Sequence, residues 1–175
     1  MTAPTLETKR LILRQWKAKD IKAFAKINSD PKVMEFFPST LTEAESNKLA
    51  KRIIKELKEK EYGLWAVEIK NKASFIGFIG LHYHDFEAAF TPCIEIGFRL
   101  AFDSWNMGYA TEGSIAVLDY SFNTLNLDKI VSFTSEKNER SIALMKKLQM
   151  QNDPKDNFEH PKLSRGHPLS KHVLY

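Results

Sequence analysis

Apolar and polar residues alternate through CIEIGFRL, residues 93–100, and this alternation predicts a β-strand. Its two faces carry different chemistry: one presents Ile94, Ile96, Phe98 and Leu100, and the other presents Cys93, Glu95, Gly97 and Arg99. Other strand-like runs occupy residues 10–16, 64–70, 74–83, 129–135 and 172–175. The short polar link NKA, residues 71–73, is typical of an antiparallel hairpin between two of these runs.

Four further segments repeat their apolar residues at helical spacing. One begins at Asp20, which we expect to cap it, one follows Thr42, and two cover residues 109–125 and 138–150. Thr42 and Glu45 match the T-x-x-E capping box that marks a helix start, and this helix is expected to end near Gly63. The element order βααβββαβαβ predicts one α/β or α+β domain, residues 1–175, around a mixed sheet.

The composition agrees with an ordinary globular domain. Apolar residues make up 43% of the 175 positions and charged residues 27%. Cys93 is the only cysteine, so no internal disulfide can form. No apolar run resembles a signal peptide or approaches the roughly 20 residues of a membrane span, so the sequence predicts a cytoplasmic protein with no membrane partner.

The net charge of +4 favours an acidic partner such as a phosphorylated cofactor, an acidic peptide or nucleic acid. The basic residues are scattered rather than gathered in blocks, which is typical of a solvated surface and argues against nucleic acid.

A strand–loop–helix corner at WNMGYATEG, residues 105–113, is the candidate phosphate site. The first N–H groups of a helix have no partner within the helix, and they carry the positive end of its dipole. Gly108 permits close approach of a ligand, and Ala110 adds little bulk. The segment lacks both the nucleoside-triphosphate loop motif and the dinucleotide motif G-x-G-x-x-G. The alternative is an ordinary helix start with a turn glycine.

Four segments together resemble the GNAT superfamily of acyl-CoA-dependent N-acetyltransferases, and within it the branch that includes the ribosomal-protein N-terminal acetyltransferases. They are TKRLILR (8–14), FIGFIGL (75–81), IEIGFRLAFDSWNMGYATEG (94–113) and NERSIALMKKL (138–148). The resemblance implies a mostly antiparallel mixed sheet flanked by helices, splayed between its fourth and fifth strands, and acetyl-CoA as the acyl-donor cosubstrate.

The resemblance also implies which residues hold coenzyme A. The pyrophosphate would lie on backbone N–H groups of the loop, and the pantetheine arm would pair with the strand before it. The residues that match these positions are Phe98, Arg99, Leu100, Met107, Gly108, Tyr109, Ala110, Thr111, Asn138 and Ser141. Met107 stands where the family often has lysine. Asn138 has an equally good structural interpretation as a helix N-cap.

For catalysis, Glu95 is the candidate general base. Burying a carboxylate on a mostly covered strand is costly, so its presence there points to a function or to an ion-pair partner. The alternative is a buried ion pair between Glu95 and Arg99 on the same face. His82 and His84 are further candidates for the base. The tyrosine that serves many relatives as general acid is replaced by Met145, so Ser141, Tyr120 or water would take that role.

The amine acceptor is a protein N-terminus or a small molecule, and the sequence does not distinguish them. We expect its pocket to involve Phe36, Phe37, Trp65, His82 and His84, although the aromatic residues could equally be core. Cys93 is interpreted as core or pocket wall, and no metal site is expected because the histidines lack ligand spacing. A homodimer remains open. The rival function is a non-catalytic module that binds coenzyme A or nucleic acid on the same fold.

Overall fold

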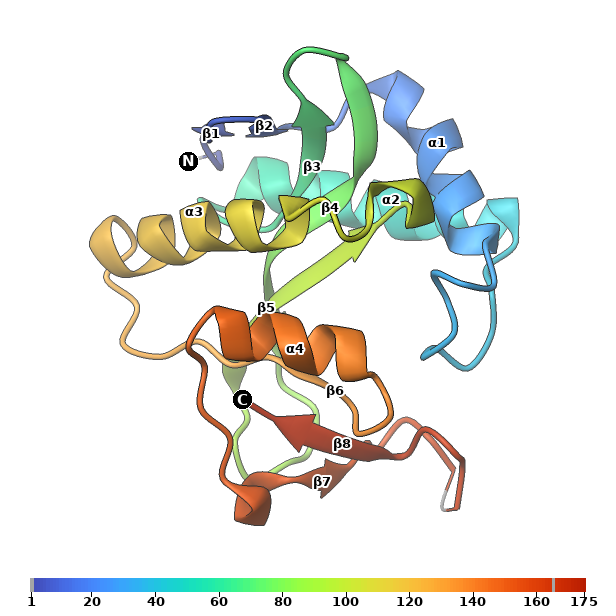
Figure 1. Cartoon of the computed structure of the whole chain (residues 1–175), viewed down its shortest axis with the longest axis vertical. Helices are drawn as coiled ribbons and strands as arrows, with labels where there is room; N and C mark the ends of the chain where they lie inside the picture. The colour runs from blue at the N-terminus through green and yellow to red at the C-terminus, as the bar shows by residue number, and fades with distance from the viewer. Residues whose placement is uncertain (1, 165) are drawn as a thin grey trace.

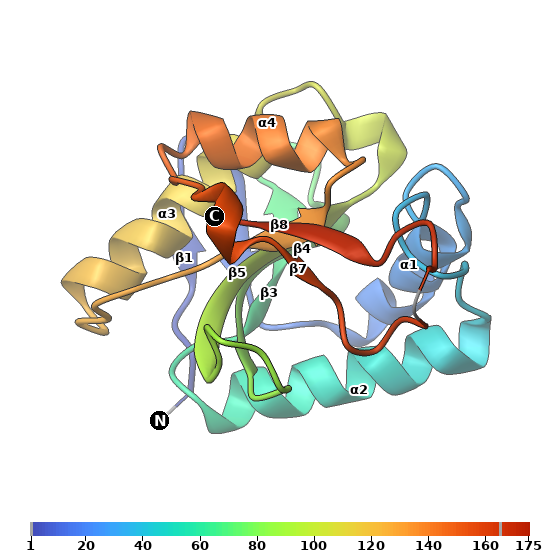
Figure 2. The same ribbon diagram turned by 90° about the horizontal axis from the view of Figure 1, so that it is seen from below.

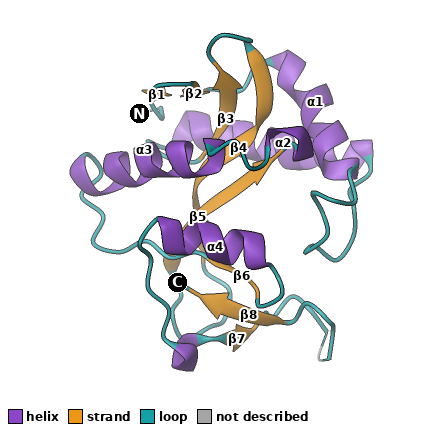
Figure 3. Ribbon diagram, in the orientation of Figure 1, coloured by secondary structure: helices purple, strands orange, loops and turns teal. Residues whose placement is uncertain are grey.

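The computed structural model of the protein describes residues 2–164 and 166–175 (Figure 1). Five antiparallel strands form the main sheet, each hydrogen-bonded to the next: β1 (Leu6–Glu7), β2 (Leu11–Arg14), β3 (Leu64–Ile69), β4 (Ser74–His84) and β5 (Cys93–Leu100). A smaller sheet has the order β6 (Phe133–Ser135), β8 (Lys171–Leu174) and β7 (Phe158–Glu159), and it lies below the main sheet (Figure 3).

Helices cover both faces of the main sheet (Figure 2). α1 (Ala18–Ser29) and α2 (Glu43–Glu59) lie on one face, and α3 (Tyr109–Asn123) and α4 (Glu139–Lys147) lie on the other side. Short 3-10 turns occupy Phe102–Ser104 and Pro154–Asp156. The predicted α/β class and mostly antiparallel sheet are confirmed.

The core forms where these layers meet the sheet. On one face Phe24 of α1 packs against Phe78 of β4 with ring centroids 5.9 Å apart, and both side chains are buried. On the other face α3 comes close to the sheet at Gly113, where an added Cβ would lie only 2.5 Å from Ile79 Cδ1. A side chain at Gly113 would therefore push α3 away from the sheet.

β5 and β6, which are the fourth and fifth of the strands expected from the sequence, separate after a short contact, as the family resemblance implies. Ile96 N donates to Val131 O at 2.8 Å and Val131 N to Ile94 O at 3.0 Å, which makes a parallel bridge just before β6. Beyond it β6 pairs with β8 instead. Because backbone direction alternates along a strand, the N–H and C=O of Phe98 face the resulting slot, and they have no backbone partner among the described residues.

Several element boundaries differ from the sequence prediction. α1 starts after Lys17, not at Asp20, which instead occupies the third helical position and accepts from Lys17 N at 2.7 Å. The capping box of Thr42 and Glu45 is confirmed, but α2 ends at Glu59, before Gly63. The strands β1 and β7, two residues each, were not predicted, because such short segments carry no periodic signal.

None of the helices within the described ranges combines the length and the apolar character that crossing a bilayer requires. The final strand, β8, pairs with β6 and β7 of its own chain.

Candidate active site

A carboxylate and a histidine lie in contact where the slot between β5 and β6 begins. Glu95 Oε2 is 2.7 Å from His84 Nε2, and each side chain is less than a fifth exposed. Burial raises the pKa of the Glu95 carboxyl above its usual range, while the His84 hydrogen bond opposes that rise. A carboxylate with a raised pKa is a better proton acceptor near neutral pH than an ordinary one.

His82 completes this group on the same face of the sheet. It lies directly opposite Glu95 in the register of β4 and β5, and its ring centroid is 4.6 Å from that of His84. Burial, followed by the nearby His84, lowers the pKa of His82 to about 4. His82 is therefore neutral at physiological pH, and the hydrogen bond between Glu95 and His84 joins the other two members of this group.

The alternative interpretation of Glu95 as the ion-pair partner of Arg99 is wrong. Arg99 Nη1 donates instead to Asn28 Oδ1 at 2.7 Å, and Glu95 binds His84. The two side chains lie on the same strand face with Gly97 between them. An added Cβ on Gly97 would have only Glu95 Oε2 within 4 Å, at 4.0 Å, so open space lies above this glycine.

Aromatic rings surround the His84 end of the site. The ring of His84 has its centroid 5.4 Å from that of Phe86 and 5.1 Å from that of Phe133. Further rings from the small sheet continue the cluster, which contains Phe86, Phe90, Phe133, Phe158, His160 and His172. Sequence analysis singled out His82 and His84 in this region but not these six rings, because only the tertiary fold brings their three separate segments together.

The loop before α3 has the conformation expected of an anion site. Gly108 adopts a left-handed φ of 77° as the N-cap of α3, and Asn106 has a φ of 59°. No side chain caps this helix start, so its first N–H groups remain available among the described residues. Met107 is 56% exposed beside them.

Arg10 lies against this loop, and sequence reasoning missed it. Its Nη1 donates to Met107 O at 2.9 Å, and its Nε donates to Glu112 Oε2 at 2.6 Å. These two bonds pin the loop to the first turn of α3. The Met107 carbonyl turns toward Arg10, and the guanidinium places a positive charge beside a loop that has no lysine of its own. Only the fold could reveal this, since Arg10 is 97 residues from Met107 in the chain.

Asn138 and Ser141 open α4 as predicted, with Asn138 in the structural role. Asn138 Oδ1 accepts from Ser141 N at 3.1 Å, and its Nδ2 donates to Thr134 Oγ1 at 3.0 Å. Met145 is fully buried. The Tyr120 hydroxyl donates to Glu61 O at 3.0 Å and the Tyr120 ring packs on Trp65, so the proton of this hydroxyl is already engaged.

The residues expected to bind the acceptor do not all come together. Phe37 covers Arg99, whose Cζ lies 4.3 Å from its ring centroid, and Phe36 lies near Arg140. Trp65 is fully buried and donates to Pro4 O at 2.7 Å, so it is a core residue outside the site.

Cofactor contacts need one refinement as well. Ala101 N donates to Ile76 O of β4, and alternation then turns the backbone of Arg99 toward β4 too. Leu100 O, on the slot side, accepts from Trp105 Nε1 at 2.9 Å. Of Phe98, Arg99 and Leu100, Phe98 is therefore the residue whose backbone N–H and C=O have no partner on the slot side among the described residues.

Cys93 is half-buried, and burial raises the pKa of its thiol to about 11.

Within the described residues, no group of three or more His, Cys, Asp or Glu side chains is arranged to hold a metal ion.

Comparisons with known proteins agree on one family. The model of the acetyltransferase (GNAT) domain matches residues 10–151. The uncharacterized N-acetyltransferase YnaD of Bacillus subtilis (strain 168) is 29% identical over 85% of this chain and 83% of its own length, and YoaA of the same organism is 31% identical over 86% and 84%. A GNAT-family acetyltransferase structure from Bacillus anthracis superposes with a TM-score of 0.80 at 23% identity, covering 98% of this chain and 96% of the other.

Proposed function

The chain belongs to the GNAT family of acetyltransferases, and from this premise we propose that it moves an acetyl group from acetyl-CoA directly to a primary amine, as a single acetyltransferase domain. The observation that carries the proposal is the arrangement along the slot between β5 and β6. An uncapped helix start lies at the loop of Gly108, free backbone groups of Phe98 face the slot, and the Glu95–His84 pair lies where the slot begins.

The cosubstrate fits this arrangement through backbone groups. The N–H groups of the loop and of the first turn of α3, from Met107 to Thr111, would receive the pyrophosphate, with Arg10 adding charge beside them. The pantetheine arm is a chain of amides, and Phe98 offers it one N–H and one C=O in the manner of a neighbouring strand. Asn138 is already committed to capping α4, so it supports this edge rather than reaching freely into it.

The chemistry requires three proton movements. Glu95, directly or through a water, takes a proton from the ammonium, because only the neutral amine is a nucleophile and an alkyl ammonium has a pKa of roughly 10. The amine nitrogen then bonds to the thioester carbon, the carbon–sulfur bond breaks, the new amide nitrogen loses its second proton, and the departing thiolate takes a proton. In our proposal Ser141 or water gives its proton to the thiolate and regains one from the amide nitrogen, because Met145 has none to give.

His84 positions the Glu95 carboxylate rather than replacing it. The 2.7 Å contact holds Oε2 of the carboxylate, a backbone hydrogen bond from Phe133 also reaches this group, and the amine would use a remaining lone pair. Backbone N–H groups of the slot would stabilise the oxyanion of the tetrahedral intermediate.

The acceptor is a small amine or a protein N-terminus. Structural neighbours include a spermidine N-acetyltransferase from Vibrio cholerae, solved in complex with CoA and spermine, with a TM-score of 0.72 at 19% identity. Another is a putative ribosomal-protein-serine acetyltransferase from the same organism, with a TM-score of 0.74 at 17% identity. Identities this low support a shared fold and leave the acceptor to experiment.

The test separates an enzyme from a module that only binds coenzyme A. Calorimetry with acetyl-CoA is expected to give saturable binding, and thiol release over a panel of amines and peptides is expected to identify an acceptor. Glu95→Gln should keep acetyl-CoA binding and lower kcat by roughly 10²- to 10⁴-fold. Binding without thiol release from any acceptor would favour the non-catalytic alternative. This alternative is worth testing because Met145 stands where many relatives have the tyrosine that serves as general acid.

A further inference from the structure

Arg99 is a half-buried cation that has no anionic partner among the described residues. Its Nη1 donates to Asn28 Oδ1, whereas its Nε is enclosed and has no hydrogen-bond partner. Arg99 takes part in none of the ion pairs of the described residues, so no carboxylate oxygen among them lies within 4 Å of its nitrogens. Burial lowers the pKa of Arg99 to about 10, which reflects the cost of an uncompensated charge.

One nitrogen of the guanidinium is left for a carboxylate. Nη1 is used by Asn28 and Nε is enclosed, whereas Nη2 is neither enclosed nor hydrogen-bonded among the described residues, so it can donate to a carboxylate oxygen. Aromatic rings surround this cation, with Cζ 4.3 Å from the centroid of Phe37 and 5.5 Å from that of Phe78. Such apolar surroundings strengthen a charge pair by keeping water away from it.

The place of Arg99 on the sheet points to the acceptor. Glu95, Gly97 and Arg99 follow one another on the same face of β5, with open space over Gly97. Strand geometry separates the Cα atoms of Glu95 and Arg99 by roughly 13 Å, and both side chains leave the strand on the face of Gly97, with Glu95 Oε2 4.0 Å from the Cβ position of this glycine. A small molecule on this glycine would therefore have a proton acceptor at one end and a cation at the other.

A purely structural role does not account for the charge. Asn28 already joins α1 to α2, because its side-chain Nδ2 donates to Ser46 Oγ at 2.8 Å. Its backbone carbonyl also accepts from Leu41 N. A neutral donor in place of Arg99 would serve Asn28 Oδ1 equally well. The guanidinium adds a positive charge that nothing in the described chain neutralises.

We infer that Arg99 binds a carboxylate of the acceptor, and that the acceptor is an amine that also carries a carboxylate, such as a free amino acid or a close analogue. The inference rests on the proposed acetyl transfer and specifies its substrate class. A polyamine would bring a second positive charge toward Arg99 and is disfavoured. A peptide N-terminus followed by an acidic residue would present the same chemistry and is separated by experiment.

The experiment uses matched probes that differ only at the carboxylate. Free amino acids and their carboxamides are compared as acceptors by thiol release, and as ligands by calorimetry with coenzyme A already bound. The wild-type protein should prefer the acid over the amide by roughly 10- to 100-fold in kcat/KM, the range of a charge-assisted pair. Acidic and neutral peptides of equal length form a parallel arm; a preference for the acidic peptide over free amino acids would identify the peptide as the source of the carboxylate.

Two variants locate the preference. Arg99→Met should abolish the difference between acid and amide while leaving the affinity for acetyl-CoA unchanged, and Arg99→Lys should restore part of it. Lys32→Met removes an exposed charge from the neighbouring loop and serves as the control that keeps the full preference.

The outcomes separate this inference from the proposed function. Selective binding of acids by the wild type, lost in Arg99→Met, supports the anion subsite even if no acetyl group is transferred, in which case the proposed function fails alone. Equal binding of acid and amide, a preference for polyamines, or an equal loss of both probes in Arg99→Met would overturn the inference whether or not acetyl transfer occurs.

Discussion

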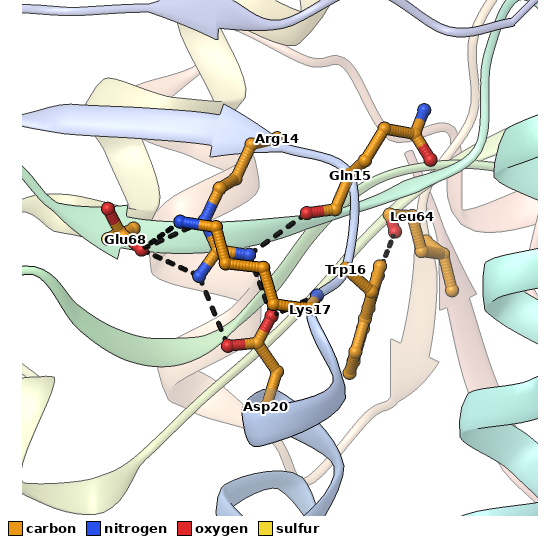
Figure 4. A network of polar contacts seen from close by, with 7 residues as sticks. All are labelled: Arg14, Gln15, Trp16, Lys17, Asp20, Leu64 and Glu68. Atoms are coloured by element: carbon orange, nitrogen blue, oxygen red, sulfur yellow. Dashed lines mark hydrogen bonds and ion pairs between the residues drawn. The ribbon is translucent and has the colours of Figure 1, made fainter.

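Arg14 and Arg99 both carry a guanidinium into the interior, and their surroundings are opposite. Arg14 lies between Asp20 and Glu68, with nitrogen–oxygen distances of 2.7 Å to each, and all three side chains are less than a tenth exposed (Figure 4). Its hydrogen bonds and charge interactions with these two acids outweigh burial, so the pKa of Arg14 is raised. Arg99 has one neutral partner, Asn28, and its pKa is lowered by burial.

The difference separates an arginine that holds the fold together from one that is available to a ligand. The Arg14 network joins the end of β2, the start of α1 and the end of β3, and every charge in it has a counter-charge. Arg99 lacks its counter-charge within the described chain. An unpaired charge that is removed from water lowers stability, so Arg99, unlike Arg14, would gain from the anion that we infer the substrate to carry.

Removing the charge of the paired arginine, Arg14, should have the largest effect on stability. Arg14→Met leaves Asp20 and Glu68 as buried carboxylates without a cation, and this is expected to cost about 3–5 kcal/mol of unfolding free energy. Urea unfolding followed by tryptophan fluorescence measures the change. A loss under about 1 kcal/mol would mean that the network contributes nothing beyond packing.

The matched change at the unpaired arginine should be much smaller. In Arg99→Met the lost hydrogen bond to Asn28 is offset because a lone charge is no longer buried, so the unfolding free energy should change by at most about 1 kcal/mol. A destabilisation equal to that of Arg14→Met would contradict the comparison and make Arg99 a structural residue.

The paired network should also respond to acid. The Arg14 hydrogen bond lowers the pKa of Glu68 below its usual range, so its contribution to stability is present above the unfolded value of about 4.5 and is lost as pH falls through the lower folded value. Glu68→Gln should therefore be less stable than wild type at pH 7, by about 1.5–3 kcal/mol. The difference in urea midpoint should shrink below pH 4, and a constant difference would argue against the ion pair.

Much of the fold could be predicted because its elements carry strong local patterns. The strict alternation of residues 93–100 gave the bounds of β5, and Thr42 with Glu45 gave the start of α2. Asp20 was misplaced by three positions because an acid in the first helical turn and an N-cap acid look alike in sequence. Its true role depends on Arg14 and Glu68, and Glu68 lies 54 residues from Arg14 in the chain.

The parts of the site that lie within one continuous stretch of sequence could be predicted, and the contacts between distant stretches could not. The loop of Gly108 and the candidate base Glu95 lie in continuous motifs, and Glu95 could be singled out as a carboxylate on a covered strand. Its contact with His84, the support from Arg10 and the unpaired state of Arg99 are long-range facts. The same limit explains Trp65, whose size suggests a pocket wall although Pro4 and Tyr120 hold it in the core.

Arg10 offers an intermediate case, because it is paired but 44% exposed. Arg10→Gln removes the charge and the hydrogen bonds that tie the loop at Met107 to the first turn of α3 at Glu112. We expect a loss of about 1 kcal/mol in stability and an acetyl-CoA affinity roughly fivefold weaker, measured by calorimetry. Lys9→Gln removes a neighbouring exposed charge and is the control. Unchanged affinity in Arg10→Gln would place the pyrophosphate away from this arginine.

The smallest effect should come from adding an unpaired cation in solvent instead of burying one. Met107→Lys places an ammonium at the 56% exposed position beside the start of α3, where water screens it. Acetyl-CoA should bind more tightly by less than about 1 kcal/mol, at most roughly fivefold, and the gain should fade as ionic strength rises from 0.01 to about 0.5 M. Met107→Leu should change nothing. A gain in Met107→Lys that persists at high salt would mean that this loop, like Arg99, is shielded from water when its ligand is bound.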